Sequence, residues 1–425
     1  MPRFSRRTVG KAALATGLSV LVSTKSRAQE RFDVVVVGGG FGGATAAKYI
    51  RKIAPKLSVA LIEQNEVFYT CPFSNLVLGG VRPLNSIAHR YDNLASKWGI
   101  TVIHQRAGRI DPGARLIRMP GGREIGFDKA ILSPGIDFDL EAIPGYDKAA
   151  LALMPHAWKA GPQTRDLRAQ LEAMQDGGTV IISPPKNPFR CPPGPYERAS
   201  MIAHYLKTAK PKSKILILDP KSKFSKEGLF KQAWKQLYPG MIEHLAAADD
   251  GEVVRVDARK LELESAFGTV HKGDVVNFIP PQTAGVIATN AGLANDDGWC
   301  PVDPVTFESR KAKDVHIIGD SAVAGAMPKS GFSANSQGKI AALNVVAALT
   351  GRQPVDGSFA NTCYSFVAPD YGISVAKVYR STPDSIVGIE GSGGLSPKDA
   401  DADFRAAEAH YAEGWYDAIT QDMFG

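Results

Sequence analysis

A short apolar run followed by closely spaced glycines is the first strong pattern in the chain. Val34 to Val37 predict a buried strand, and a helix is expected from the glycines to about Pro55. A second apolar run, "SVALIE", predicts a strand that ends at Glu63. The glycines between the first strand and the helix follow the spacing G-x-G-x-x-G and are Gly38, Gly40 and Gly43.

This strand, turn, helix, strand and terminal acid together predict a dinucleotide-binding site, which the glycine spacing alone would not. The glycines let the backbone approach a pyrophosphate at a helix N-terminus, where amides and the helix dipole favour anions. Glu63 is expected to accept hydrogen bonds from the adenosine ribose. A glycine-rich turn without a ligand is the alternative. The pattern fits NAD and FAD equally, so later segments must distinguish them.

Two later apolar strands end in short motifs, Ser133-Pro134-Gly135 and Gly319-Asp320. In this order and spacing they resemble the distal motifs of flavoproteins with two dinucleotide domains. The resemblance implies FAD, with Gly135 and Gly319 in the cofactor site and Asp320 on the ribityl side. A long helix is expected after them, with its N-terminus facing the flavin. Lys329 would add positive charge there, with a solvated lysine as the alternative.

Between these blocks lies a second strand, helix, strand pattern: "TVIIS" at 179–183, a helix from about 195 to 207, and "KILILD" at 214–219. Its phosphate loop carries one glycine and six prolines. Prolines lack the backbone N–H donors that a pyrophosphate needs. We therefore expect this domain to have kept its fold and lost NAD. The prolines are Pro184, Pro185, Pro188, Pro192, Pro193 and Pro195.

The predicted fold class is α/β, with two Rossmann-like domains of the disulfide-reductase type and a C-terminal α+β interface domain. The FAD domain is expected from two segments, 31–145 and 275–355, with the altered nucleotide domain, 146–274, inserted between them. Period-two stretches in "CYSFVAPDYGISVAKVYR" predict an antiparallel sheet within 356–425.

The net charge of +7 belongs to the first residues of the chain. Residues 1–28 carry six basic residues and no acid, so the remainder has a net charge of +1, which argues against a nucleic-acid partner. Arg6-Arg7, an apolar stretch and the small residues Ser26 and Ala28 resemble a twin-arginine signal peptide. We expect a periplasmic protein. A membrane anchor is the alternative, but the apolar stretch falls short of the ~20 residues that a spanning helix needs.

The chain has four cysteines, which allow three complete disulfide pairings. They form neither C-x-x-C nor C-x-x-C-H, so neither a zinc site nor covalent haem is expected on this chain. Cys191 precedes the predicted helix of the second domain, where a helix dipole would favour a thiolate.

Several further segments resemble the flavoprotein subunit of flavocytochrome c sulfide dehydrogenase and, more distantly, sulfide:quinone oxidoreductases. They are "GGGFGGATAAKYI", "FYTCPFSNLVLGG", "MPHAWKAGPQT", "NPFRCPPGPYERAS", "GWCPVDP", "VHIIGDSAVAGAMPKSGFSANSQGK" and "NTCYSFVAPDYGISV". The flavoprotein of the thiosulfate-oxidising system shares the pattern.

The resemblance implies that Cys191 and Cys363 form a redox-active disulfide over the flavin, that sulfide attacks it, and that the freed thiolate, assigned to Cys363, reacts with the flavin. Cys71 would be tied covalently to FAD, and Glu197 would transfer protons. The alternatives are a plain stabilising bridge for the cysteine pair, a buried free thiol for Cys71 and a helix-dipole contact for Glu197. Cys300 has no implied role and is expected to be buried.

A c-type cytochrome subunit is the electron acceptor that the resemblance implies, with quinone as the runner-up. Residues 396–425 contain seven acidic residues against two basic ones, which is unfavourable for docking on an anionic membrane. A redox partner of a sulfur carrier, acting by thiol–disulfide exchange, stays open. An NADH-dependent disulfide reductase is a further alternative, and for it we expect no reduction of the flavin by NADH.

Overall fold

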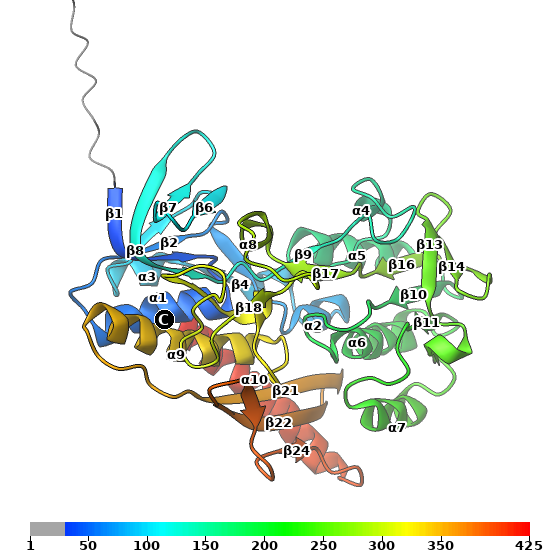
Figure 1. Ribbon diagram of the computed structural model, residues 1–425. Coiled ribbons are helices and arrows are strands. Elements are labelled where there is room, and N and C mark those ends of the chain that lie inside the picture. Colours follow the sequence, from blue (N-terminus) through cyan, green and yellow to red (C-terminus); the bar gives the residue numbers. More distant parts are fainter. Residues whose placement is uncertain (1–29) are drawn as a thin grey trace, which may run out of the picture.

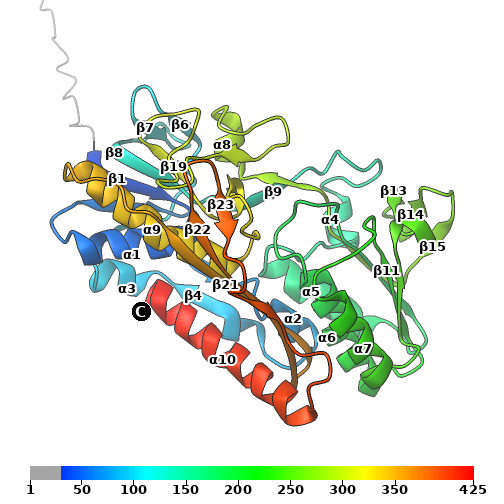
Figure 2. The same ribbon diagram turned by 60° about the horizontal axis from the view of Figure 1, so that its bottom comes forward.

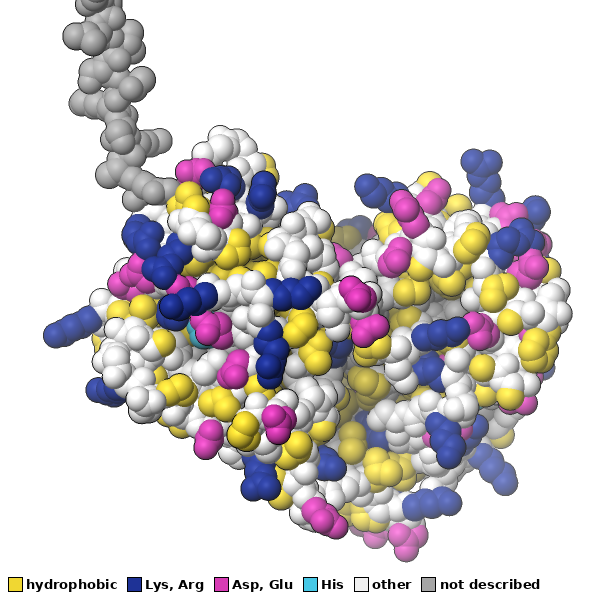
Figure 3. All heavy atoms as spheres, viewed as in Figure 1, with side chains coloured by type: hydrophobic (Ala, Val, Ile, Leu, Met, Phe, Trp, Pro, Cys, Tyr) yellow, Lys and Arg dark blue, Asp and Glu magenta, His cyan; other side chains and the backbone are white. Residues whose placement is uncertain are grey.

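The computed structural model describes residues 30–425, so the predicted signal peptide lies outside the described residues. Two α/β lobes lie side by side, and the C-terminal segment runs beneath both of them (Figure 1). Figure 3 shows the two lobes separated by a hollow on one face, with acidic and basic side chains interspersed over both.

The first lobe is built on a seven-stranded sheet in the order β5-β2-β1-β8-β7-β6, with β19 also paired to β8. β1, β2, β5, β8 and β19 run parallel, so their carboxyl ends meet at one edge. The strands are β1 (Glu30–Val37), β2 (Val59–Ile62), β5 (Thr101–Ile103), β6 (Arg109–Asp111), β7 (Leu116–Arg118), β8 (Glu124–Leu132) and β19 (Val315–Ile317).

Two helices that are distant in sequence, α1 (Phe41–Ile53) and α9 (Gly331–Leu349), pack closely against each other in this lobe. A Cβ atom at Gly338 of α9 would lie 2.6 Å from the carbonyl oxygen of Gly42. Only glycine permits this approach. The first lobe therefore includes elements from both sides of the second lobe in the sequence, because β19 pairs with β8 and α9 packs on α1.

The second lobe has a parallel four-stranded sheet in the order β12-β11-β10-β16. The strand–helix–strand prediction is confirmed by β10 (Thr179–Ser183), α6 (Gly194–Ala209) and β11 (Lys214–Leu218). The predicted domain boundary at 274 is wrong by a few residues, because β16 (Val275–Phe278) pairs with β10 and completes this sheet. Also in this lobe are α4 (Ala150–Leu153), α5 (Pro162–Ala173), α7 (Glu227–Leu237), β12 (Ile242–Leu245), β13 (Val253–Asp257), β14 (Glu262–Ser265) and β15 (Val270–Lys272).

The C-terminal segment is the predicted antiparallel sheet followed by one long helix, α10 (Ala402–Phe424). In Figure 2 this helix lies beneath the sheet and reaches back to α1 and α3 of the first lobe. None of the helices in residues 30–425 combines the length and apolar character needed to cross a bilayer. The strands of this segment are β21 (Ser358–Ala368), β22 (Tyr371–Ser381), β23 (Ile386–Gly388) and β24 (Gly394–Leu395).

Short elements connect these parts. β9 (Ile136–Phe138) and β17 (Gln282–Ala284) pair with each other where the chain passes between the lobes. The others are β3 (Val67–Tyr69), α2 (Ser74–Leu78), β4 (Ala88–Arg90), α3 (Asp92–Ser96), α8 (Val286–Asn290), β18 (Cys300–Pro301), β20 (Ala322–Val323) and 3-10 turns at Leu84–Ile87, Ala247–Asp249 and Gly319–Ser321.

Candidate flavin and thiol site

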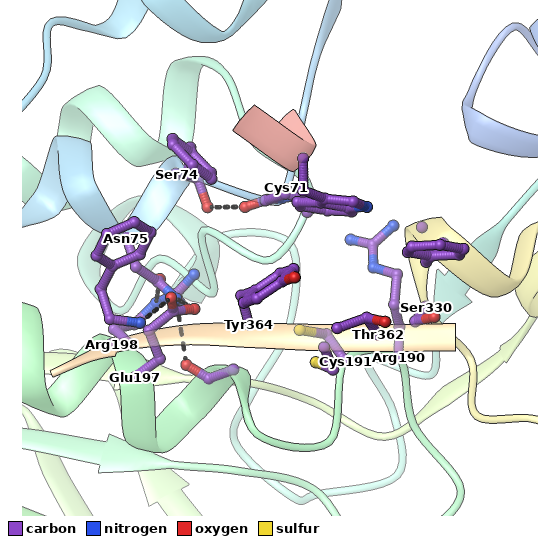
Figure 4. A pocket seen from close by; sticks show the side chains of 18 of the residues that line it. Cys71, Ser74, Asn75, Arg190, Cys191, Glu197, Arg198, Ser330, Thr362 and Tyr364 are labelled. Carbon is purple, nitrogen blue, oxygen red and sulfur yellow. Dashed lines mark hydrogen bonds between the residues drawn. The ribbon is translucent and has the colours of Figure 1, made fainter. Parts of the chain in front are cut away.

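A pocket of about 700 Å³, counting the part open to solvent, is bounded by loops of both lobes and by β21. It brings together three of the four cysteines with a carboxylate and two guanidinium groups. Figure 4 shows Cys71 on one side of the pocket and Cys191 on the other, with Glu197 toward one end. The residues that carry the argument below are Cys71, Asn75, Trp158, Arg190, Cys191, Glu197, Arg198, Cys363 and Trp415.

The turn between β1 and α1 requires glycine, as the sequence predicted. Gly38 has φ +93°, and a Cβ there would lie 2.3 Å from the carbonyl oxygen of Ser133. A Cβ at Gly43 would lie 1.9 Å from the carbonyl oxygen of Gly38. Glu63 follows β2 directly, and its carboxylate accepts a hydrogen bond of 2.9 Å from the amide of Gly39. The backbone is therefore bare at the start of α1, where a pyrophosphate would bind.

The carboxylate of Asp320 has a free acceptor that a flavin nucleotide could use. Its Oδ1 is buried and has no hydrogen-bond partner among the described residues. Burial raises the pKa of this carboxyl, against the nearby charges of Arg190 and Lys329. A buried acceptor without a donor is costly unless a ligand supplies one. The hydroxyl groups of a ribityl chain are suitable donors, so these residues fit FAD.

Lys329 connects this motif to the cysteine loop and does not line the pocket. Its Nζ donates to the carbonyl oxygens of Asp320 at 2.7 Å and Ala322 at 3.1 Å, and it lies 3.7 Å from the centre of the Trp299 ring. Burial lowers the pKa of Lys329 to about 8. Its own carbonyl accepts a 2.8 Å hydrogen bond from the amide of Cys191. That the charge of Lys329 lies beside a flavin stays a prediction.

Cys191 and Cys363 line the same pocket although 172 positions separate them in the sequence. Both are free thiols in the structure, so the predicted disulfide is not formed here and stays a prediction. Cys191 has φ +58°, a left-handed conformation that non-glycine residues rarely adopt. Cys363 lies on β21, opposite Val375 of β22.

The predicted lowering of the Cys191 pKa by the helix dipole is wrong for the free thiol. Burial raises its pKa well above the ordinary value, and the neighbouring Cys363 and Glu197 raise it further. The helix dipole favours the thiolate by a small amount, whereas burial removes the water that would solvate its charge.

Cys71 and Cys300 have different environments. Cys71, in the loop before α2, donates from Sγ to the carbonyl oxygen of Trp158 at 3.2 Å and lines the pocket. Cys300 is fully buried in β18, as expected, and lies outside the pocket lining. Burial raises the pKa of Cys300 to about 11.

Glu197 lies in the first turn of α6, as predicted, and is held from two sides. Asn75 donates to its Oε2 at 2.8 Å, and the backbone amide of Phe366 donates to its Oε1 at 2.9 Å. Burial raises the pKa of this carboxyl, while the two hydrogen bonds and the charges of Lys226 and Arg198 oppose the rise. A carboxyl with a raised pKa beside two thiols is suited to accept and return a proton.

Three further residues at the site, Arg190, Arg198 and Asn75, were not predicted from the sequence. Arg198 is buried and donates to Asn75 and to the carbonyls of His156 and Ala157. Arg190 reaches into the pocket, and its Nε has no partner among the described residues. For Arg190 and Arg198, proximity to Cys191 in the chain was the available signal, whereas Asn75 had none. Two tryptophans, Trp158 and Trp415, also line the pocket.

The corresponding turn of the second lobe is filled by side chains. Tyr196 of α6 stacks on Phe224 with ring centres 3.6 Å apart, and its hydroxyl donates to Asp219. Asp219 also pairs with Lys221 at 2.6 Å and with His244 at 3.0 Å. The acid that would bind a ribose is therefore already satisfied within the protein. This packing supports the predicted loss of NAD.

Within residues 30–425, no group of three or more His, Cys, Asp or Glu side chains is placed to hold a metal ion. The chemistry that the described side chains offer is that of thiols, a carboxylate and a nucleotide cradle.

Comparison with known proteins identifies three matching family models. Residues 32–170 match pyridine nucleotide-disulphide oxidoreductase, residues 164–280 match the central part of the sulfide dehydrogenase [flavocytochrome c] flavoprotein chain, and residues 355–424 match the flavin-binding part of flavocytochrome c sulphide dehydrogenase.

The curated relatives are consistent with these matches. The flavoprotein chain of sulfide dehydrogenase [flavocytochrome c] from Chlorobaculum thiosulfatiphilum is 66% identical over 44 residues, which is 10% of this chain and 92% of that sequence. The mitochondrial sulfide:quinone oxidoreductase of Mus musculus is 24% identical over 69% of this chain. That alignment spans 66% of the mouse protein, just under two thirds of its length.

Solved structures agree on the fold. The sulfide:quinone oxidoreductase of Aquifex aeolicus superposes with a TM-score of 0.68 at 18% identity, covering 92% of each chain. Putidaredoxin reductase, in its covalent complex with putidaredoxin, gives 0.64 at 15% identity over 90% of this chain and 93% of that one. On these matches, the chain belongs to the family of flavocytochrome c sulfide dehydrogenase flavoprotein chains.

Proposed function

We propose that the chain is the flavoprotein subunit of a periplasmic sulfide dehydrogenase, which oxidises sulfide to zero-valent sulfur and passes the electrons to a c-type cytochrome. The observation that carries the proposal is the convergence on one pocket of Cys363 with Cys191 and Glu197, which come from two distant points of the chain. Family membership supports the substrate. Residues 1–28 support the location by their resemblance to a twin-arginine signal.

The proposed reaction starts from the oxidised pair, in which Cys191 and Cys363 share a disulfide. Hydrosulfide attacks Cys191 Sγ, a new sulfur–sulfur bond forms, and the bond between the two cysteines breaks. The bonding electron pair stays on Cys363 Sγ as a thiolate, and Cys191 carries a persulfide. The sulfide sulfur has thereby given two electrons to the cysteine pair.

Glu197 handles the proton in this scheme. Its carboxylate accepts the proton that the persulfide releases and returns it as the pair is restored. Asn75 and the amide of Phe366 orient the carboxylate toward the pocket by fixing both oxygens. FAD, when bound, would accept the two electrons and release them one at a time to a haem protein.

The residues that would hold FAD are those of the glycine turn and the distal motifs: Gly38, Gly40, Gly43, Glu63, Gly135, Gly319 and Asp320. Lys329 would contribute charge through the same loop. Cys71 lies in the pocket wall opposite Cys191 and is the proposed point of covalent attachment. The mass of the denatured polypeptide tests this. We expect an FAD-sized increment that the Cys71→Ser variant lacks, and a wild-type mass without the increment would contradict attachment.

The cytochrome partner is inferred from the name of the Chlorobaculum relative, a flavocytochrome c flavoprotein chain. The mouse and Aquifex relatives are named for quinone, so quinone is the second candidate acceptor. Purified protein supplied with sulfide should reduce soluble cytochrome c faster than a short-chain quinone. The Cys191→Ser variant should lose the reaction. A protein that reduces quinone and spares cytochrome c would overturn the acceptor, and a Cys191→Ser variant with full activity would overturn the thiol mechanism.

A further inference from the structure

Lys226 is a buried cation beside the cysteine pair that none of the steps above uses. It is 4% exposed and stands at the N-terminal end of α7 in the second lobe. Its side chain reaches β21, where Nζ donates to the carbonyl oxygen of Cys363 at 2.8 Å and to Ser365 Oγ at 2.7 Å. A longer contact of 3.4 Å joins it to the carbonyl oxygen of Ile373.

Three local features make this position unfavourable for a lysine. Its φ of +62° is left-handed, which costs an L-residue free energy. It caps a helix N-terminus, where the dipole disfavours a cation. Within residues 30–425 every hydrogen-bond acceptor of its Nζ is neutral, although a buried charge needs a counter-charge. A residue that breaks several local rules is expected to serve a site.

Two other buried lysines show what a structural role looks like. Lys221 pairs with Asp219 at 2.6 Å, which neutralises its charge. Lys210 donates to the carbonyls of Leu171 and Glu172 at the end of α5, where the helix dipole favours a cation. Lys226 differs from both, because it neither pairs with a carboxylate nor lies at a helix C-terminus.

The ionisable groups around Lys226 come from β21, α6, the loop before α6 and α10, while β22 contributes the carbonyl of Ile373. They are Cys363 on β21, Glu197 on α6, Cys191 in the preceding loop and Glu408 on α10. Burial lowers the pKa of Lys226, and these four groups oppose the fall. Glu408 is already occupied by Ser374, Ser396 and Arg405. The remaining anions that would neutralise the ammonium are the carboxylate of Glu197 and a cysteine thiolate.

The two cysteines are placed unequally with respect to this cation. Burial raises the pKa of the Cys363 thiol, and the charge of Lys226 is the main influence that opposes the rise, while Glu197 adds to it. For Cys191, burial, Cys363, Glu197 and Cys71 all raise the pKa, and the charge of Arg190 opposes them. Of the two sulfur atoms, that of Cys363 is therefore the better leaving group, because the thiol of lower pKa leaves faster.

We propose that Lys226 is a positioning residue that stabilises the thiolate of Cys363 and thereby directs sulfide to Cys191. The proposal rests on the proposed function for its biological meaning. When the disulfide opens, the electron pair of the broken bond goes to Sγ of Cys363, the residue whose carbonyl oxygen accepts from the ammonium, and the new bond forms on Cys191 Sγ. Attack on Cys363 would instead leave the thiolate on Cys191, which influences Lys226 less than Cys363 does.

The test measures each thiol separately and needs neither sulfide nor cytochrome. The reduced holoprotein is alkylated with iodoacetamide across a pH series, and peptide mass spectrometry quantifies the label on Cys191 and Cys363. In the wild type we expect Cys363 to be labelled at lower pH than Cys191. The reverse order would overturn the proposal, and this result requires no variant to fold.

Variants then assign the effect to the charge. Lys226→Gln keeps a hydrogen-bond donor and removes the charge, so the labelling midpoint of Cys363 should rise by about one pH unit, which is about tenfold less thiolate at a fixed pH. Lys226→Arg should restore the wild-type midpoint, and Lys210→Gln, a matched buried lysine far from the thiols, should leave it unchanged. An unchanged midpoint in folded Lys226→Gln would contradict the proposal. If Cys363 is labelled at lower pH than Cys191 but the wild-type protein does not oxidise sulfide, the proposed function is wrong and the role of Lys226 still stands.

Discussion

The two Rossmann-like lobes begin with the same strand, turn and helix, but their turns differ in what they leave open. After β1, Gly38 and Gly43 leave no room for a side chain, and the backbone is bare. After β10, prolines remove amide donors, and Tyr196 and Phe224 stack in the space that follows. The comparison teaches that the fold persists when its ligand site is filled, because core packing and sheet pairing do not depend on the ligand.

The turn after β10 also has a different role from the turn after β1. Its loop carries Cys191 in a left-handed conformation, anchored by the hydrogen bond from its amide to Lys329 of the first lobe. The loop thus spans the junction of the lobes and places a sulfur atom in the pocket that β21 and Cys71 also border. One lobe carries the glycine turn proposed to hold the nucleotide, and the other carries Cys191, the proposed target of sulfide.

The largest effect is expected from a substitution that disrupts the turn between β1 and α1. Gly43→Ala would bring a Cβ to 1.9 Å from the carbonyl oxygen of Gly38, so α1 must shift away from the nucleotide. We expect purified Gly43→Ala protein to contain almost no flavin by its visible absorbance. Gly228→Ala on α7 of the second lobe is the control, because a Cβ there meets nothing within 4 Å. Equal flavin content in the wild type and Gly43→Ala would contradict the assigned cradle.

A smaller effect is expected from Glu197→Gln. This substitution keeps the shape of the side chain in the first turn of α6 and removes the carboxylate that accepts the proton. Turnover with sulfide should fall by about 100-fold. Because burial raises the Glu197 pKa, wild-type activity should increase with pH through that raised pKa, as the carboxylate forms. The variant should lack this increase, while the ionisation of sulfide itself affects both proteins equally. A variant with the wild-type pH profile would remove Glu197 from the mechanism.

The smallest effect concerns the packing that fills the second turn. Tyr196→Phe removes one hydrogen bond to Asp219 and should lower the free energy of unfolding by about 1 to 2 kcal/mol, with sulfide turnover unchanged. Urea unfolding provides the measurement. A large loss of activity would show that Tyr196 belongs to the reaction site.

The same cluster should make stability depend on pH. Burial alone would raise the Asp219 pKa, but the hydrogen bond from His244 and the charge of Lys221 outweigh it and hold the pKa below its usual range. A depressed carboxyl pKa contributes stability that is present above its unfolded value of about 3.9 and is lost as pH falls through the folded value. The free energy of unfolding of the wild type and of Asp219→Asn is measured as the pH is lowered. The same pH dependence in both proteins would contradict this contribution.

Local sequence patterns were sufficient for much of this architecture. The glycine spacing, the two distal motifs and the period-two strands each act within a few residues, so β1, α1, β2, α6 and β21 could be predicted. The assignment of β16 to the second lobe could not, because its partner β10 is almost a hundred residues away and the pairing is decided by the whole sheet.

The site shows the same limit. Cys191, Cys363 and Glu197 followed from a family resemblance, whereas Lys226 and Asn75 have no motif and become visible only when α7 and α2 are placed beside β21 and α6. The pKa of Cys191 was also misjudged, because burial is a property of the folded pocket and no local pattern encodes it.

The most direct test of the central claim compares two reductants on one protein. Under anaerobic conditions, the visible flavin absorbance of the holoprotein is followed as sulfide or NADH is added, in the wild type and in Cys191→Ser. The account predicts that sulfide bleaches the wild-type flavin, that the variant resists sulfide, and that NADH bleaches neither. Bleaching of the wild type by NADH, or the absence of bleaching by sulfide, would contradict it.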